Sequence, residues 1–136
     1  MIPFDIQLRP GRPVSEQVVF AVKRAVAKGV LRPGDAFPSV RSLGKDLRIN
    51  PNTAQKIVAA LTQEGVLEIE PGIGARVANP RHTHVAEKEQ RLREQLEVAL
   101  IEARLLGMDS ERIRALMDEI SQNLNPEEDH DRNSED

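Results

Sequence analysis

The sequence contains no cysteine, tryptophan or tyrosine, and its phenylalanines are Phe4, Phe20 and Phe37. The absence of cysteine excludes disulfides, thiolate metal sites and cysteine nucleophiles. Aromatic residues make up only 2% of the chain. This disfavours RNA-binding sheets and oligonucleotide-binding barrels, because those folds stack bases on aromatic rings. The hydrophobic core must therefore be built mainly from aliphatic side chains.

The sequence also lacks long apolar runs, and its start lacks the basic-then-apolar pattern of a signal peptide. We therefore expect a soluble, cytoplasmic protein. No Ser/His/Asp arrangement stands out, and Gly72-Ile73-Gly74 is too short for a phosphate-binding loop. His82 and His84 lie in a linker, where solvation is favoured over metal binding. We expect no enzymatic activity, no cofactor and no metal.

Acidic residues are the minority in the amino-terminal part of the chain, and basic residues are the minority in the carboxy-terminal part. Residues 1–81 contain 12 Lys and Arg against 7 Asp and Glu, a balance of +5, whereas residues 82–136 contain 7 against 15, a balance of −8. This asymmetry indicates different partners for the two parts, although charge alone is equally compatible with ordinary solvated surfaces. The length of 136 residues suits one compact domain with a small appendage.

The sequence pattern of the amino-terminal part predicts three helices. Alternating apolar residues over 4–8 indicate a short strand or an extended arm, and helical spacing of valines predicts a first helix over 14–26. Ser39 is a good N-cap for a short second helix, and Asn50 caps a third helix that begins with Pro51. Because the joint is short, the second and third helices must cross steeply, which is the helix-turn-helix arrangement.

A β-hairpin is predicted directly after the third helix, which ends at Gly65. The alternation in VLEIEPGIGARVA places Leu67, Ile69 and Val77 on the apolar side of two short strands, with a turn over 71–74. A hairpin in this position is a wing, so the amino-terminal part is predicted to be a winged helix-turn-helix.

The third helix combines a buried stripe with a polar face. The stripe consists of Ala54, Ile57, Val58 and Leu61. The polar face consists of Asn52, Thr53, Gln55 and Lys56. Asn and Gln amides match the N6/N7 edge of adenine in the major groove, while hydroxyl and ammonium groups suit phosphates. Ser39 and Arg41 lie where the second helix begins, and a helix N-terminus attracts phosphate. The alternative is an ordinary polar surface on which Ser39 and Asn50 serve only as caps.

The sequence pattern of the carboxy-terminal part predicts two helices and an acidic tail. After a linker over 81–90, a long helix ends near Gly107, and Asp109 caps a last helix. Their apolar stripes are too wide to be covered within one subunit, which favours a homodimer with a joint helical bundle. The residues expected in the shared core are Leu96, Leu100, Ile113, Leu116 and Ile120. Residues 125–136 contain six acids, one arginine and no large apolar residue, so we expect a disordered tail.

Several motifs in combination resemble the winged-helix DNA-binding domain of GntR-type bacterial transcription regulators. They are Pro-Ser-x-Arg at Pro38–Arg41, the segment QEGVL after the third helix, and Gly72-x-Gly74 in the wing. Pro-Ser-Val-Arg followed by Asn-Pro-Asn-Thr is similar to the YtrA subfamily, whose members carry a short two-helix dimerisation region. The segment LLGMDSERIRALMDEI is similar to that region. The resemblance covers roughly residues 10–124.

This resemblance implies a dimeric repressor of its own operon, with an ABC transporter among the regulated genes. It implies a DNA-binding domain over 1–80 and a dimerisation region over 81–124, which the tail over 125–136 follows. The partner is double-stranded DNA with a pseudo-palindromic operator. The expected DNA-contacting residues are Ser39, Arg41, Asn50, Asn52, Thr53, Gln55, Lys56, Gly72 and Arg76. Ile73 stands where a basic wing residue is frequent, with Arg76 as a substitute phosphate ligand. The rival hypothesis is a winged helix that binds protein instead of DNA.

Overall fold

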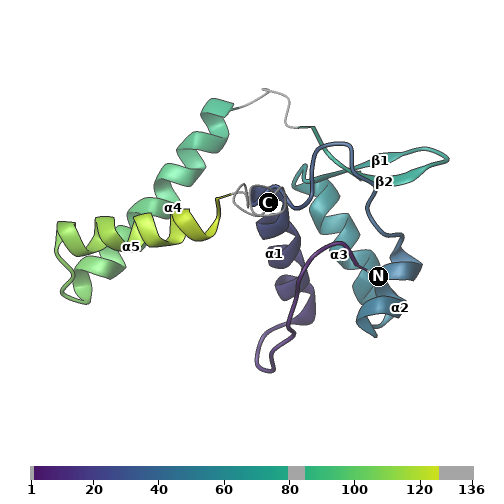
Figure 1. Cartoon of the computed structure of the whole chain (residues 1–136), viewed down its shortest axis with the longest axis horizontal. Coiled ribbons are helices and arrows are strands. Elements are labelled where there is room, and N and C mark those ends of the chain that lie inside the picture. Colours follow the sequence, from purple (N-terminus) through teal and green to yellow (C-terminus); the bar gives the residue numbers. More distant parts are fainter. Residues whose placement is uncertain (1, 80–84, 126–136) are drawn as a thin grey trace, which may run out of the picture. The chain divides into compact units, whose positions relative to one another are not determined.

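The computed structural model describes residues 2–79 and 85–125. Within these ranges the chain forms five helices and one antiparallel pair of strands, which confirms the mostly helical fold class with a small hairpin (Figure 1). The elements are α1 (Val14–Ala27), α2 (Val40–Leu47), α3 (Pro51–Gln63), β1 (Leu67–Glu70), β2 (Gly74–Val77), α4 (Val85–Leu105) and α5 (Ser110–Asn123). The chain divides into two compact units, an amino-terminal one that ends at the linker and a carboxy-terminal one that contains α4 and α5.

The amino-terminal unit begins with an extended arm and not with a strand. Phe4 of the arm is buried and stacks on Phe37 with 6.1 Å between ring centroids, while Ile6 is half-buried. The side-chain amide of Gln17 holds the end of the arm against α1. It accepts from the backbone N–H of Arg9 at 2.8 Å and donates to the carbonyl oxygens of Arg9 and Arg12 at 2.8 and 3.1 Å. The arm is therefore fixed by one apolar and one polar anchor.

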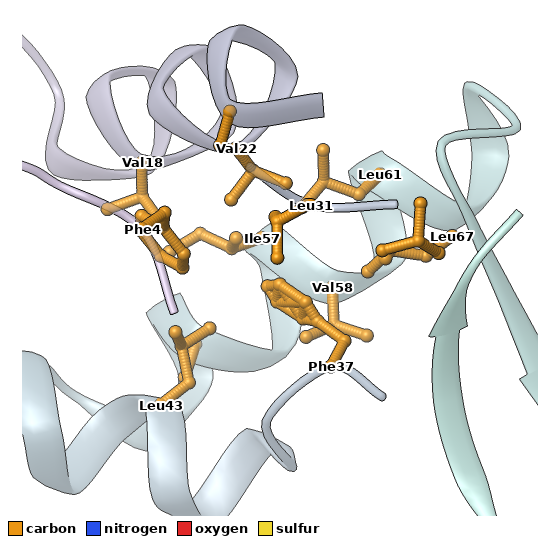
Figure 2. Packing of buried hydrophobic residues seen from close by; sticks show 13 residues of the cluster. Phe4, Val18, Val22, Leu31, Phe37, Leu43, Ile57, Val58, Leu61 and Leu67 are labelled. Carbon is orange, nitrogen blue, oxygen red and sulfur yellow. The ribbon is translucent and has the colours of Figure 1, made fainter. Parts of the chain in front are cut away.

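Helix α3 lies at the centre of the amino-terminal unit and contacts α1, α2 and β1. Its predicted stripe is buried as expected, because those four positions recur at the spacing of one helix face. Figure 2 shows side chains from the arm, α1, α2 and β1 converging on Ile57, Val58 and Leu61 of this stripe. The core spans Phe4 to Val77, so it is complete within this unit, and it is aliphatic apart from Phe4 and Phe37.

The joint between α2 and α3 takes only Arg48, Ile49 and Asn50. Arg48 adopts the left-handed conformation (φ 55°, ψ 48°) that ends α2, and its backbone N–H donates to the carbonyl oxygen of Lys45 at 3.3 Å. Asn50 then caps α3, with Pro51 at the first helical position. This geometry confirms the predicted helix-turn-helix, because a left-handed residue at the end of α2 turns the chain sharply into α3 without a longer loop.

The hairpin pairs Leu67 with Val77 and Ile69 with Ala75, and only the first pair lies in the core. Ile69 was predicted on the apolar side of the wing, but its side chain is 56% exposed. The reason is that the hairpin extends beyond the body of the unit: Leu67 and Val77 are buried, whereas in the next pair Ala75 still packs against the core and Ile69 does not. The apolar alternation gives the face of a strand correctly, yet it does not say how far the core continues along that face.

The carboxy-terminal unit consists of α4 and α5 joined over residues 106–109. Asp109 caps α5 as predicted, and its carboxylate accepts from the backbone N–H of Arg112 at 2.8 Å. The predicted linker over 81–90 is too long, because α4 begins at Val85. The segment AEKEQ contains good helix formers and no breaker, so the helix extends through it. Among the described residues, no helix is both long enough and apolar enough to cross a membrane.

Candidate nucleic-acid interface

The start of α2 is organised by Ser39. Its hydroxyl oxygen accepts from the backbone N–H of Ser42 at 3.1 Å, and its hydroxyl also lies 3.1 Å from that of Ser42. Ser39 therefore serves as the N-cap, which satisfies one of the free donors at the helix start. Arg41 is exposed in the first turn of α2. A guanidinium at this position adds a full positive charge to the positive end of the helix dipole.

The start of α3 is organised by Asn50 in the same way. Its side-chain oxygen accepts from the backbone N–H of Asn52 at 2.8 Å, so the amide of Asn50 is engaged within the protein. The side chains of Asn52, Gln55 and Lys56 are exposed, and we call these three residues the reading face. Thr53 is half-buried, unlike its three polar neighbours, because it lies closer to the side of α3 that enters the core.

A close approach of α2 and α3 fixes how the reading face is presented. Gly44 is buried on α2, and a Cβ atom at this position would lie 3.7 Å from the Cβ of Ala54 on α3. The same atom would lie 3.4 Å from the carbonyl oxygen of Ile49 in the joint. Small residues at both positions let the two helices cross at short range. The reading face is thereby carried on a helix that is held by packing along its whole opposite side.

The wing places its predicted DNA ligands in an unexpected charge environment. Gly72 is exposed at the turn with φ 81°, a conformation that glycine adopts without strain. Ile73 beside it is also exposed. Arg76 on β2 is not free, because its Nε lies 2.9 Å from Oε2 of Glu70 on β1. The hairpin therefore presents a guanidinium that is already paired with a carboxylate.

A basic groove continues from the reading face towards the arm. It has a volume of about 1090 Å³ and lies between the arm, α1 and the outer side of α3, where Lys56 and Ala60 line it. Its other cationic lining residues are Arg9, Arg12, Lys23 and Arg24. Lys23 is paired with Glu64 at 2.7 Å. The positive charge predicted for residues 1–81 is thus partly gathered beside α3.

The carboxy-terminal unit leaves most of its predicted dimerisation residues uncovered. Leu96, Leu100, Leu116 and Ile120 are exposed in the single subunit, as the width of their stripes suggested. Ile113 differs, since only 9% of it is exposed. Ile113 is therefore already covered within the single subunit, whereas the placement of all five residues in the shared core of a dimer stays a prediction.

Metal binding has no support in the described part of the chain, which holds no group of three or more potential metal-ligating side chains. His82 and His84 lie outside the described residues. The acidic residues that follow Asn125 also lie outside them.

Comparison with known proteins matches this arrangement to one family. The profile of the bacterial regulatory proteins of the gntR family matches residues 14–77, which span α1 to β2. The HTH-type transcriptional repressor YtrA of Bacillus subtilis is 35% identical over 118 residues, which cover 86% of this chain and 91% of that protein. The chain belongs to the GntR family. It is accordingly a DNA-binding transcription regulator, as the combination of motifs indicated.

Two further comparisons extend the similarity of this GntR-family regulator over both units. A solved structure named as a transcriptional antiterminator from Listeria monocytogenes has 31% identity and a TM-score of 0.78, over 89% of this chain and 91% of that one. YtrA from Sulfolobus acidocaldarius, a GntR-family transcription factor, has 24% identity and a TM-score of 0.54, over 88% of this chain and 97% of that one. The latter similarity concerns the fold alone.

Two features of the interface were not predicted from the sequence. One is the clamp that Gln17 makes on the arm, for which a single glutamine in a helix gives no signal. The other is the pairing of Glu70 with Arg76. The turn over 71–74 sets a register in which Arg76 lies opposite Glu68 and shares a face with Glu70, so the register alone does not say which carboxylate is engaged.

Proposed function

We propose that this regulator is a dimeric repressor that recognises a pseudo-palindromic operator with α3 of each subunit. The observation that supports this most directly is the division of α3 into a buried apolar stripe and an exposed polar reading face. An α-helix fits the major groove of B-DNA, where amide side chains distinguish base pairs by their pattern of donors and acceptors. The name of the Bacillus subtilis relative as a repressor supports the direction of regulation.

The proposal gives the interface residues different roles. Asn52 and Gln55 contact base edges, because an amide can donate to and accept from adenine at once. Lys56 and Arg41 contact phosphates, which adds affinity without sequence preference. Thr53 and the two caps, Ser39 and Asn50, position the backbone of the helix starts against phosphate. Gly72 brings the backbone of the wing close to the minor groove, and Arg76 supplies a phosphate contact there.

Dimerisation is proposed because of the apolar surface that α4 and α5 leave exposed. Besides the four uncovered residues of the predicted core, this surface includes Leu92, Val98, Ile101, Leu105, Leu106 and Met117. A soluble monomer rarely exposes so much contiguous apolar area, and a second copy of the same helices covers it in the most economical way. Two linked α3 helices then bind two half-sites with an avidity that one subunit lacks.

The proposed target is the protein's own operon, with an ABC transporter among its genes, and this rests on the resemblance to the YtrA subfamily. A footprint on the DNA upstream of its gene tests the proposal. We expect two symmetric protected half-sites, with centres separated by a whole number of helical turns of roughly 10 base pairs. Protection that shows no sequence preference, or none at all, would contradict it.

The rival function is a winged helix that binds protein. An interaction module would expose apolar residues on α3, where a partner could bury them. In the described part of the amino-terminal unit, the large exposed apolar residues are Leu8, Phe20, Val30, Ile69 and Ile73. None of them belongs to α3, so the polarity of the reading face favours DNA.

A further inference from the structure

The outer face of the wing carries more negative than positive charge. Glu68 and Glu70 alternate with Leu67 and Ile69 along β1, so their side chains leave the hairpin on the same face. Arg76 of β2 lies directly opposite Glu68 in the register. Two carboxylates and one guanidinium thus share this face, which is unusual for a hairpin that approaches a polyanion.

One of the two carboxylates holds the guanidinium. The Arg76 Nε lies 2.9 Å from Oε2 of Glu70, and no other ion pair of Arg76 is found within the described ranges. Both side chains are partly open to solvent, 42% exposed for Arg76 and 48% for Glu70. A pair this exposed is weak and exchanges readily, so an incoming phosphate can compete with Glu70 for the guanidinium.

The wing is tied to the start of the helix-turn-helix, which fixes where Arg76 lies relative to α2 and α3. The backbone N–H of Phe37 donates to the carbonyl oxygen of Ala75 at 2.9 Å, and that of Val77 donates to the carbonyl oxygen of Asp35 at 2.8 Å. The chain then passes from Phe37 to the N-cap of α2 within two residues. Strand β2 is therefore held on both edges, and docking of α3 on DNA brings the wing along with it.

From these observations we infer that Glu70 is a negative determinant of DNA affinity. It occupies Arg76 in the free protein, and the wing gains its phosphate contact only when Arg76 exchanges the carboxylate for the DNA backbone. Glu70 thus keeps binding weak enough for release, and its removal strengthens binding. This inference rests on the proposed DNA-binding function.

The test measures binding of Glu70→Gln to a labelled duplex at several salt concentrations. The duplex is the site that the wild-type protein enriches from random DNA. We expect binding to tighten about two- to fivefold, the range for an exposed ion pair. We also expect the slope of log K against log salt to steepen by up to about 0.9, because Arg76 is then free to neutralise a phosphate in every complex. Glu119→Gln on α5 gives the same change in net charge and serves as the control; it should leave both quantities unchanged.

A double variant separates exchange from simple repulsion. In the background of Arg76→Gln, the substitution Glu70→Gln should have no effect on affinity or salt slope, because no guanidinium remains to be released. A gain that persists in that background overturns the proposed exchange, and so does an unchanged or weakened affinity of Glu70→Gln alone. If the wild-type protein enriches no site at all, the DNA-binding proposal itself fails. The inference about Glu70 alone fails if the wild-type protein does enrich a site and Glu70→Gln binds that site with unchanged affinity.

Discussion

The substitution Leu100→Asp should dissociate the proposed dimer. Leu100 lies on α4 with 43% of its surface exposed in the single subunit. Full burial of a leucine contributes about 1.5–3 kcal/mol, so covering this remainder contributes roughly 1 kcal/mol per subunit and about 2 kcal/mol per dimer. Aspartate removes that contribution and places a carboxylate in the interface, where desolvation without a partner costs still more.

Together these effects should raise the dissociation constant of the dimer at least about 100-fold, since each 1.4 kcal/mol is a factor of ten. Sedimentation velocity over a range of protein concentrations measures the change. Gln95→Asp introduces the same charge at an exposed polar position of α4 and should leave the dimer intact. A Leu100→Asp protein that remains a dimer with unchanged affinity would show that α4 is not the interface.

Four further substitutions or truncations have definite expected outcomes. Gly44→Ala should raise the free energy of unfolding by about 0.5–1 kcal/mol, because glycine is costly within a helix and the added Cβ meets its neighbours at ordinary van der Waals distance. A lower melting temperature of the variant would mean that α2 and α3 leave no room for the added Cβ. Lys56→Ala should weaken binding to all DNA sequences and flatten the salt slope by roughly one unit, with Lys88→Ala on α4 as a control that changes neither. Truncation after Pro80 should leave a folded monomer, because the core is complete within the amino-terminal unit. This monomer should bind DNA far more weakly, because it lacks the avidity of two linked subunits. Deletion of residues 125–136 should preserve the dimer.

The order and type of every element could be predicted from the sequence, because caps and apolar spacing are local signals. Ser39, Asn50 and Asp109 each mark a helix start at which the side chain does accept from the backbone. The properties that the sequence did not predict depend on tertiary packing. The exposure of Ile69 depends on where the core ends beneath the wing, and the burial of Ile113 depends on tertiary packing around α5.

The candidate interface could be predicted in composition but not in its electrostatics. The polar face of α3 follows from the apolar stripe, since helical spacing leaves the remaining positions outside. Thr53 shows the coarseness of that rule, because a residue at the border of the stripe is half-buried. The pairing of Arg76 with Glu70 escaped notice because a list of basic residues does not say which of them is already engaged.

The reading face of α3 is proposed to select the DNA sequence. Enrichment of bound duplexes from random DNA, carried out in parallel with the wild-type protein, Asn52→Ala and Gln55→Ala, tests it most directly. We predict a pseudo-palindromic site for the wild type and a loss of preference at particular base pairs for each variant, equivalent to about 1–3 kcal/mol at those positions. Enrichment of the same site with the same preferences by all three proteins would contradict the claim that α3 reads the DNA.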